Sequence, residues 1–487
     1  MTLDRLLTDT AIRYPGRPAV SDGRTTLSYT ELDVEVTALA DAMAARGVRR
    51  GDHVGILVPK GVAAVCAIHA ALRVGAVAAP LDPTDPADRV TRMGRAAGLG
   101  FCVVEGQAPA GFDAHVAPVG HGLGVTSSIG HEPTRTPDGG YLLFTSGSTG
   151  WPKGVLLSHE NVLHFVRWTV EEFAVGPEDR IGSQAALTFD LSTFDLFAAA
   201  MTGACAVLLP DFLKGFPRDV VTWLADERIS VFYAVPTLYQ SLLRGGVETA
   251  RLPNLRVFAF AGEPFPAGSL ERYTRSFPDR RFYNLYGPTE TNVCTFERVP
   301  EGWTAQAPLS IGRALPGLRV ELVDENGVAG VEGEIAVSGP AVFRGYLQDG
   351  VLRPRLTTIM CGDESLTAYL TGDLGVRDAD GRIHLRGRRD HQVKRRGHRI
   401  ELGDIESVVQ ELPDVRACAA VWRPDTGEGG EIWLHVVCDT AEPEQIVRLV
   451  HEALPRRMAP DRVVITAELP LTNRGKIDRE ALASTTT

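Results

Sequence analysis

Residues 143–154 (LFTSGSTGWPKG) combine serines and threonines with glycines and one lysine, between two short apolar runs. Glycines let backbone N–H groups turn toward a ligand, hydroxyls add short donors, and Lys153 adds a mobile positive charge. This composition suits a polyphosphate cradle. It is not a Walker A loop, because proline precedes the lysine and glycine follows it. For this stretch alone, an ordinary surface loop is the simpler alternative.

Residues 284–291 (NLYGPTET) are typical of a strand that ends in a turn. Tyr286 offers a flat face on which a purine can stack. Thr289 offers a hydroxyl, and Glu290 offers the hard oxygen ligand that Mg²⁺ prefers. The alternative is a strand-to-turn junction with a solvated glutamate.

Two later stretches add a carboxylate and a basic run. Asp373, in residues 369–374 (YLTGDL), could accept both hydroxyls of a ribose, with Arg388 beside it. The alternative is a Gly–Asp turn and a surface arginine. Residues 392–403 (QVKRRGHRIELG) place basic side chains around a glycine. They predict either a mobile loop that closes over an anion or a solvated charged face.

A lysine and an aspartate complete the candidate set. Lys476 follows a turn in residues 469–478 (LPLTNRGKID), where a solubilising role is the ordinary reading. Asp190 stands between apolar residues just before an expected helix (189–195, FDLSTFD). An acid in that position is either the helix N-cap or the partner of a buried cation.

The composition describes a globular protein of more than one domain. The 487 residues are 44% hydrophobic and 23% charged, which predicts two to four domains. The net charge of −11 disfavours nucleic acid or an anionic membrane as the main partner. The seven cysteines form no C-x-x-C pair, no apolar run reaches about 18 residues, and the N-terminus lacks a signal-peptide layout. We therefore expect a cytoplasmic protein with reduced thiols and no zinc site.

The pattern of elements predicts the fold class. A capping box at Ser28 opens a helix that ends near Gly47, and strands then alternate with helices as far as residue 286. From about residue 308 the pattern becomes antiparallel β, and the last ~95 residues read as a compact α+β unit. We expect a large N-terminal domain of stacked α/β sheets with a β subdomain, followed by a small α+β C-terminal domain.

In order and spacing, these stretches resemble the adenylate-forming superfamily, and more closely the amino-acid adenylation domains of nonribosomal peptide synthesis. Residues 27–32 (LSYTEL), 80–83 (PLDP), 333–339 (GEIAVSG) and 343–347 (FRGYL) match further motifs of that family. The match spans essentially the whole chain, which implies a stand-alone ligase. Arg395 and Trp151 depart from the family pattern, and neither has a role assigned here.

The resemblance implies two half-reactions and two domains, 1–389 and 390–487, with Asp390 as the hinge. The substrate carboxylate attacks the α-phosphorus of Mg-ATP, and the phosphopantetheine thiol of a separate peptidyl carrier protein then attacks the aminoacyl adenylate. Lys476 and Thr289 act in the first step, and Glu290 holds Mg²⁺. Lys394, Gly397 and His398 reach the site for the thioester step. The implied ATP-binding residues are Thr145, Ser146, Gly147, Ser148, Thr149, Gly150, Lys153, Asn284, Tyr286, Gly287, Asp373 and Arg388.

Asp190 matches the acid with which amino-acid-activating members bind the substrate ammonium. The implied pocket consists of Asp190, Leu191, Phe194, Tyr233, Ala259, Ala261, Leu285, Val293 and Cys294. Apart from Asp190 it carries no charge, so a charged or amide side chain would lose its hydrogen bonds there. The combination resembles that of L-prolyl-carrier-protein ligases, which supply pyrrole building blocks to secondary metabolites.

Three alternatives to L-proline activation remain open at this point. The small Ala259 leaves room for pipecolate, valine or leucine as the substrate. An acyl-CoA ligase is disfavoured because it needs no Asp190. A non-catalytic binding module is disfavoured because Glu290, Asp373, Arg388 and Lys476 are all present.

Overall fold

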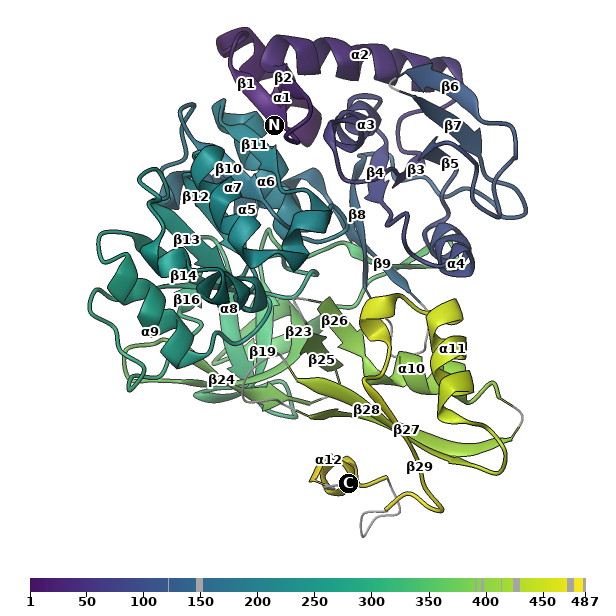
Figure 1. Ribbon diagram of the computed structural model, residues 1–487, viewed down its shortest axis with the longest axis vertical. Coiled ribbons are helices and arrows are strands. Elements are labelled where there is room, and N and C mark those ends of the chain that lie inside the picture. Colours follow the sequence, from purple (N-terminus) through teal and green to yellow (C-terminus); the bar gives the residue numbers. More distant parts are fainter. Residues whose placement is uncertain are drawn as a thin grey trace.

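The structure is a computed structural model of the full chain. It describes residues 1–120, 122–145, 152–389, 392–395, 398–412, 414–423, 430–470 and 477–484. Two large sheets, a smaller β region and a C-terminal α+β domain make up these residues (Figure 1).

The first large sheet is parallel through its centre. Val231–Ala234 and Val257–Phe260 are buried along their whole lengths, as expected of strands covered on both faces. In spatial order the strands are β16 (Arg313–Ala314), β15 (Thr295–Arg298), β14 (Arg281–Tyr286), β13 (Val257–Phe260), β12 (Val231–Ala234), β10 (Arg180–Ser183), β11 (Cys205–Leu208), β1 (Pro18–Ser21) and β2 (Thr26–Ser28).

The second large sheet carries the candidate polyphosphate stretch between two of its strands, β8 and β9, which pair antiparallel. In spatial order the strands are β21 (Val351–Arg353), β20 (Gly345–Gln348), β9 (Lys153–Leu157), β8 (Gly140–Thr145), β4 (Val77–Pro80), β3 (His53–Leu57), β5 (Phe101–Glu105), β7 (Leu123–Ser127) and β6 (Ala117–Gly120).

Helices fill the space between the two sheets, and the largest apolar core combines side chains from these helices and both sheets. The helices are α1 (Leu3–Arg13), α2 (Tyr29–Ala45), α3 (Val62–Arg73), α5 (His159–Glu172) and α6 (Leu191–Thr202). The sequence pattern sets two of their starts. Ser28 and Ser158 each form a capping box, with Glu31 and Asn161 respectively.

Other helices cover the outer faces. One outer core joins the first sheet to α7 (Pro217–Asp226), α8 (Pro236–Arg244) and α9 (Ala267–Ser276), with short 3₁₀ turns η1 (Asp211–Gly215) and η2 (Val247–Thr249) nearby. A second joins the other sheet to α4 (Ala87–Ala97). The neighbouring strands β10 to β14 of the first sheet pair in parallel. Their carboxyl ends therefore meet at one edge of the sheet, where open α/β sheets bind ligands.

A third, mainly antiparallel sheet follows. Its strands are β18 (Ala329–Gly330), β17 (Arg319–Val323), β19 (Glu332–Ser338), β23 (Glu364–Arg377) and β22 (Thr357–Cys361), with β24 (Ile383–Arg388) paired to β23. The pairing of β23 with β24 sets Asp373 directly opposite Arg388, which brings these two predicted ribose-site residues together.

The C-terminal domain is smaller and has its own apolar core. Its elements are the hairpin β25 (Gln392–Arg395) and β26 (His398–Glu401), α10 (Leu402–Val409), β27 (Val415–Arg423), β28 (Glu431–Cys438), α11 (Pro443–Ala453), η3 (Arg456–Met458), β29 (Arg462–Ile465) and α12 (Arg479–Ser484). Figure 1 shows hairpin β25–β26 pointing toward the third sheet, whereas α12 lies at the far end of this domain.

The predicted fold class is confirmed, including the change to antiparallel β after residue 308 and the small C-terminal domain. The sequence pattern assigned no element to α1, although Leu3, Leu6, Leu7 and Thr10 repeat at helical spacing and are buried. It also treated the segment around Asp373 as the end of a short extended run, whereas β23 is a 14-residue strand.

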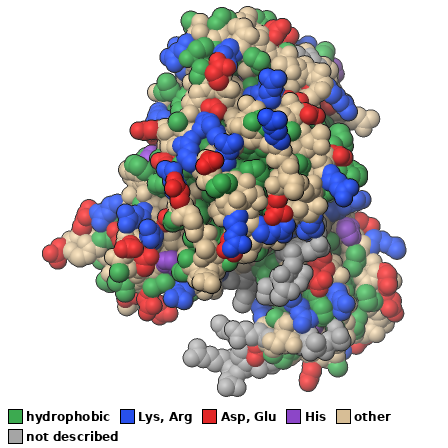
Figure 2. Space-filling view, turned by 60° about the vertical axis from the view of Figure 1, so that its left-hand side comes forward, with side chains coloured by type: hydrophobic (Ala, Val, Ile, Leu, Met, Phe, Trp, Pro, Cys, Tyr) green, Lys and Arg blue, Asp and Glu red, His purple; other side chains and the backbone are tan. Residues whose placement is uncertain are grey.

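Within the described residues, no helix is long and apolar enough to cross a membrane. On the face drawn in Figure 2, acidic and basic side chains are interspersed with apolar ones. The described residues on that face form no continuous basic surface of the kind by which proteins usually bind nucleic acid.

Arg395, which departs from the family pattern, fixes the hairpin to the C-terminal domain. Its guanidinium donates to the Ala459 carbonyl oxygen (2.9 Å) and forms an ion pair with Asp461. We expect Arg395→Met to lower the free energy of unfolding by about 1–3 kcal/mol, because Asp461 would keep its charge without this partner. The measurement is the unfolding transition of the C-terminal domain in a calorimetric scan.

Arg416→Met is the matched control for Arg395→Met. Arg416 also pairs with an aspartate, Asp439 (3.0 Å), but both side chains are more than half exposed. Such pairs contribute little to stability. Equal shifts of the transition in the two variants would contradict the anchoring role of Arg395.

Candidate active site

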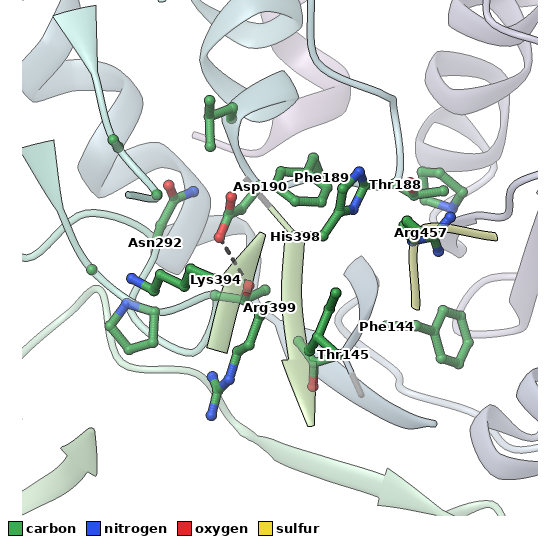
Figure 3. Close-up of a pocket in the computed structure, with 18 of the residues that line it drawn as sticks. Phe144, Thr145, Thr188, Phe189, Asp190, Asn292, Lys394, His398, Arg399 and Arg457 are labelled. Carbon is green, nitrogen blue, oxygen red and sulfur yellow. Dashed lines mark hydrogen bonds between the residues drawn. The ribbon is translucent and has the colours of Figure 1, made fainter. Parts of the chain in front are cut away.

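Asp190 lies at the carboxyl edge of the first sheet, in the connection from β10 to α6. It occupies the N-cap position of α6, but its side chain makes no capping hydrogen bond. Instead, the carboxylate accepts a hydrogen bond from the Thr289 hydroxyl (2.9 Å). Burial raises the pKa of Asp190, against the opposing effects of this bond and of the Lys394 charge. A partly buried carboxylate that faces a cavity is equipped to bind a cationic group (Figure 3).

The cavity around Asp190 has an apolar side. Of the predicted pocket residues, Leu191, Tyr233, Ala261 and Val293 line it together with Asp190. Phe194, Ala259, Leu285 and Cys294 are buried in the core shared by both sheets. Burial raises the pKa of the Cys294 thiol to about 12, so this group stays neutral at ordinary pH. The predicted pocket residues that line the cavity thus combine one carboxylate, Asp190, with apolar side chains.

Three of the predicted nucleotide-binding residues meet beside this cavity. The buried Tyr286 donates its hydroxyl to Asp373 (2.6 Å), and Arg388 forms an ion pair with the other oxygen of the same carboxylate. Asp373, Arg388 and Gly287 line the cavity, as does Thr145. Asn284, by contrast, donates its side-chain amide to the Ser310 carbonyl oxygen (2.7 Å), so it stabilises the sheet edge in this state.

Glu290 is fully buried, so the alternative of a solvated glutamate is wrong. Arg399 donates to both of its oxygens, at 3.2 and 2.9 Å, and Tyr346 donates its hydroxyl to one of them at 2.5 Å. Burial by itself would raise the pKa of Glu290, but the charge of Arg399 and the Tyr346 hydrogen bond outweigh it and lower the pKa. Glu290 is therefore held as a carboxylate.

The hairpin β25–β26 brings basic side chains into the cavity. Lys394 and Arg399 lie directly opposite each other on the two strands, and both line the cavity with His398 (Figure 3). The Lys394 ammonium is 5.7 Å from the centre of the Tyr286 ring. His398 packs edge-on against Phe189, with 4.7 Å between the ring centres. The basic run lines the cavity instead of forming a fully solvated face, and its closure over an anion stays a prediction.

An adjoining cavity lies between the hairpin and the second sheet. Glu290, Arg399, Lys153 and Tyr346 line it, and Thr145 borders both cavities. The Lys153 ammonium is 5.7 Å from the centre of the Tyr346 ring. Eight predicted site residues fall outside the described residues: Ser146, Gly147, Ser148, Thr149, Gly150, Asp390, Gly397 and Lys476.

The residues around Glu290 would fit a magnesium ion only if Arg399 moved away from the carboxylate. No group of three or more His, Cys, Asp or Glu side chains able to hold a metal occurs among the described residues. A single buried carboxylate nevertheless suits Mg²⁺, which takes one or two protein carboxylates and completes its shell with phosphate and water. Both oxygens of Glu290 contact Arg399 here, so a metal fits only after that guanidinium withdraws.

The structure also places at the site four residues to which the sequence motifs assign no role: Arg399, Tyr346, Gln392 and Phe189. Each lies within a stretch that carries the family resemblance, which predicts a site in that part of the chain. A buried carboxylate such as that of Glu290 needs a cationic partner, so its burial is the signal that points to one. The partner itself could not be identified, since Arg399 and Glu290 are 109 positions apart.

Two protein families together match most of this chain. The family described as AMP-binding enzyme matches residues 7–347, and its C-terminal domain family matches residues 404–476. The chain belongs to the AMP-binding enzyme family, as the sequence resemblance predicted, and it is a ligase-type enzyme.

Two relatives of similar length are both named L-proline--[L-prolyl-carrier protein] ligase. The one from Pseudomonas fluorescens is 34% identical over 97% of this chain and 96% of its own length. The one from Streptomyces coelicolor is 35% identical over 98% of this chain and 95% of its own length.

Solved structures agree with this family. The crystal structure of IdnL1 is 30% identical, with a TM-score of 0.80 over 96% of this chain and 98% of that one. Holo-PA1221, described as a protein with adenylation and PCP domains bound to a vinylsulfonamide inhibitor, has a TM-score of 0.81 at 24% identity, over 99% of this chain and 84% of its own. The second likeness concerns the fold alone.

Proposed function

We propose that this protein activates L-proline with Mg-ATP as prolyl-AMP and transfers the prolyl group to the phosphopantetheine thiol of a peptidyl carrier protein. The observation that carries the proposal is Asp190, one carboxylate against the apolar walls formed by Leu191, Tyr233, Ala261 and Val293. Two relatives named as ligases with this substrate support it. A supply of prolyl groups for pyrrole building blocks would follow.

Proline suits these walls because of its shape and charge. Its ring is compact and apolar, and its secondary ammonium has two N–H donors for Asp190. A substrate with a charged or amide side chain would lose its hydrogen bonds against the apolar walls at a cost of several kcal/mol. Thr289 would then position the carboxylate of Asp190 through the 2.9 Å hydrogen bond.

The nucleotide would occupy the neighbouring space. Tyr286 would face the purine, Asp373 and Arg388 would bind the ribose, and the stretch from Thr145 to Lys153 would hold the β- and γ-phosphates. Glu290 would hold Mg²⁺, which neutralises phosphate charge during attack on the α-phosphorus. In-line attack on phosphorus depends mainly on positioning and charge neutralisation.

The two half-reactions would use two positions of the C-terminal domain, with Asp390 as the hinge between 1–389 and 390–487. Lys476 would serve the first step. Hairpin β25–β26 would serve the second, and its presence in the cavity, with Lys394 and His398 among the lining, supports that assignment. Such domain movements can separate steps that need different groups at one site.

The test is ATP–pyrophosphate exchange over a panel of amino acids. We expect proline to give the highest rate, pipecolate, valine and leucine lower rates, and charged or amide side chains rates near the blank. A proline rate equal to the blank would refute the substrate, and a higher rate with one of the other three would replace it. Exchange without any amino acid would refute amino-acid activation itself. Transfer is then measured as prolyl thioester on a phosphopantetheinylated carrier protein.

A further inference from the structure

Arg399 supplies the positive charge beside the buried Glu290 carboxylate. One guanidinium nitrogen reaches both carboxylate oxygens, at 3.2 and 2.9 Å, and the Glu290 side chain is only 1% exposed. Tyr346 adds a hydrogen bond of 2.5 Å to the first oxygen. The buried charge of Glu290 is thus neutralised by a side chain of the C-terminal domain.

This arrangement and a metal cannot occupy Glu290 together. Mg²⁺ binds carboxylate oxygens at about 2.0–2.1 Å and demands near-ideal octahedral geometry. A guanidinium within hydrogen-bond distance of both oxygens fills the space that the metal and its other ligands need. Two cations this close would also repel each other.

The position of Arg399 depends on the whole hairpin. Its Nε donates to the Gln392 side-chain oxygen (2.7 Å), which also accepts from Arg388 (2.6 Å). Arg399 is the cross-strand neighbour of Lys394. Withdrawal of this part of the hairpin therefore removes Arg399 from Glu290 and moves Lys394 with it.

We propose that Glu290 holds one cation at a time: Mg²⁺ while the hairpin is withdrawn, and Arg399 once the hairpin has docked. The proposal rests on the proposed function, and it makes Arg399 a positioning residue for the thioester step. A buried carboxylate left without a cation is strongly unfavourable, so each state needs one of the two. Consequently, Lys394 and His398 dock only after Glu290 has lost its metal, which orders the two half-reactions.

Docking can be measured directly by cross-linking. Phe189 and His398 pack against each other while the hairpin lies in the cavity. Withdrawal of the hairpin would separate them, so cysteines at both positions would report docking through a short bis-maleimide. The probe is a non-hydrolysable ATP analogue, with either EDTA or increasing Mg²⁺. With Arg399 present, we expect Mg²⁺ to slow cross-linking at least about fivefold relative to EDTA. In Arg399→Gln the effect of Mg²⁺ should fall below about twofold.

Arg389→Gln is the matched control. Arg389 stands near the same hinge and pairs with Glu334 (2.9 Å) rather than with Glu290, so its variant should keep the full effect of Mg²⁺. Arg399→Lys retains a positive charge and should restore part of the effect, which tests the proposal if Arg399→Gln folds poorly. An equal effect of Mg²⁺ with and without the arginine would overturn the proposal.

Activity separates this proposal from the proposed function. In Arg399→Gln, transfer from preformed prolyl-AMP to the carrier thiol should fall at least about tenfold more than proline-dependent exchange falls. Equal losses in both half-reactions would overturn the positioning role. If the unmodified protein showed no proline-dependent exchange, the proposed function would be refuted instead. The cross-linking result would still decide whether Arg399 and Mg²⁺ compete for Glu290.

Discussion

Replacing Asp190 with alanine is expected to lower kcat/KM for proline in ATP–pyrophosphate exchange by about 100-fold or more. The carboxylate is the one charged group among the pocket residues that the sequence predicts, and burial raises its pKa. A substrate ammonium that enters without this partner would lose its hydration and gain no counter-charge. Exchange assays measure the loss, and ATP binding, followed by calorimetry, should remain.

Two graded variants separate charge from shape at Asp190. Asp190→Asn keeps the size and the ability to accept from Thr289, so a loss close to that of alanine would assign the effect to charge. Thr289→Val removes the hydroxyl that donates to Asp190 at 2.9 Å and is expected to lower kcat/KM about tenfold. Unchanged proline turnover in Asp190→Ala would refute the role given to this residue.

Replacing Lys476 with alanine is expected to lower proline-dependent exchange by about 10²- to 10³-fold. The proposed role is a compact ammonium that bridges the substrate carboxylate and the charge developing on the α-phosphate, a role that a lysine on a flexible stem suits. Transfer from preformed prolyl-AMP to the carrier thiol should change less than about threefold, because the first half-reaction is bypassed.

Lys153→Ala is the control for a general loss of positive charge. Lys153 lies on β9 and lines the cavity that also contains Glu290. Its proposed contact is with the outer phosphates, so the variant should mainly raise KM for ATP. If Lys476→Ala slowed both half-reactions equally, the assignment of this lysine to the first step alone would be wrong.

Local patterns gave most of the secondary structure correctly, for a physical reason. Parallel strands buried on both faces appear as short apolar runs, as in β12 and β13, and capping boxes such as that of Ser28 mark helix starts by hydrogen bonds within four residues. The patterns failed where an element is stabilised by distant contacts. Helix α1 packs on α2, α3 and α6, and β23 pairs with three strands of the third sheet.

The chemistry of the site could be predicted as a set of groups but not as an arrangement. The residue types and order of Asp190, Glu290, Asp373 and Lys476 sufficed to indicate amino-acid adenylation through the family resemblance. The identity and order of these residues are given by the sequence itself, and each stands in a motif a few residues long.

Only the tertiary structure decided which cation Glu290 holds and where the basic run lies. Thr289 meets Asp190 across 99 positions, and Arg399 meets Glu290 across 109. The first contact depends on which strands are neighbours in the first sheet, and the second depends on how the C-terminal domain packs against the sheets. No short-range periodicity encodes either arrangement. The sequence thus determined the groups available for catalysis, whereas the packing of the domains decided which of them share the site, because a buried charge is stable only beside a partner that the fold delivers.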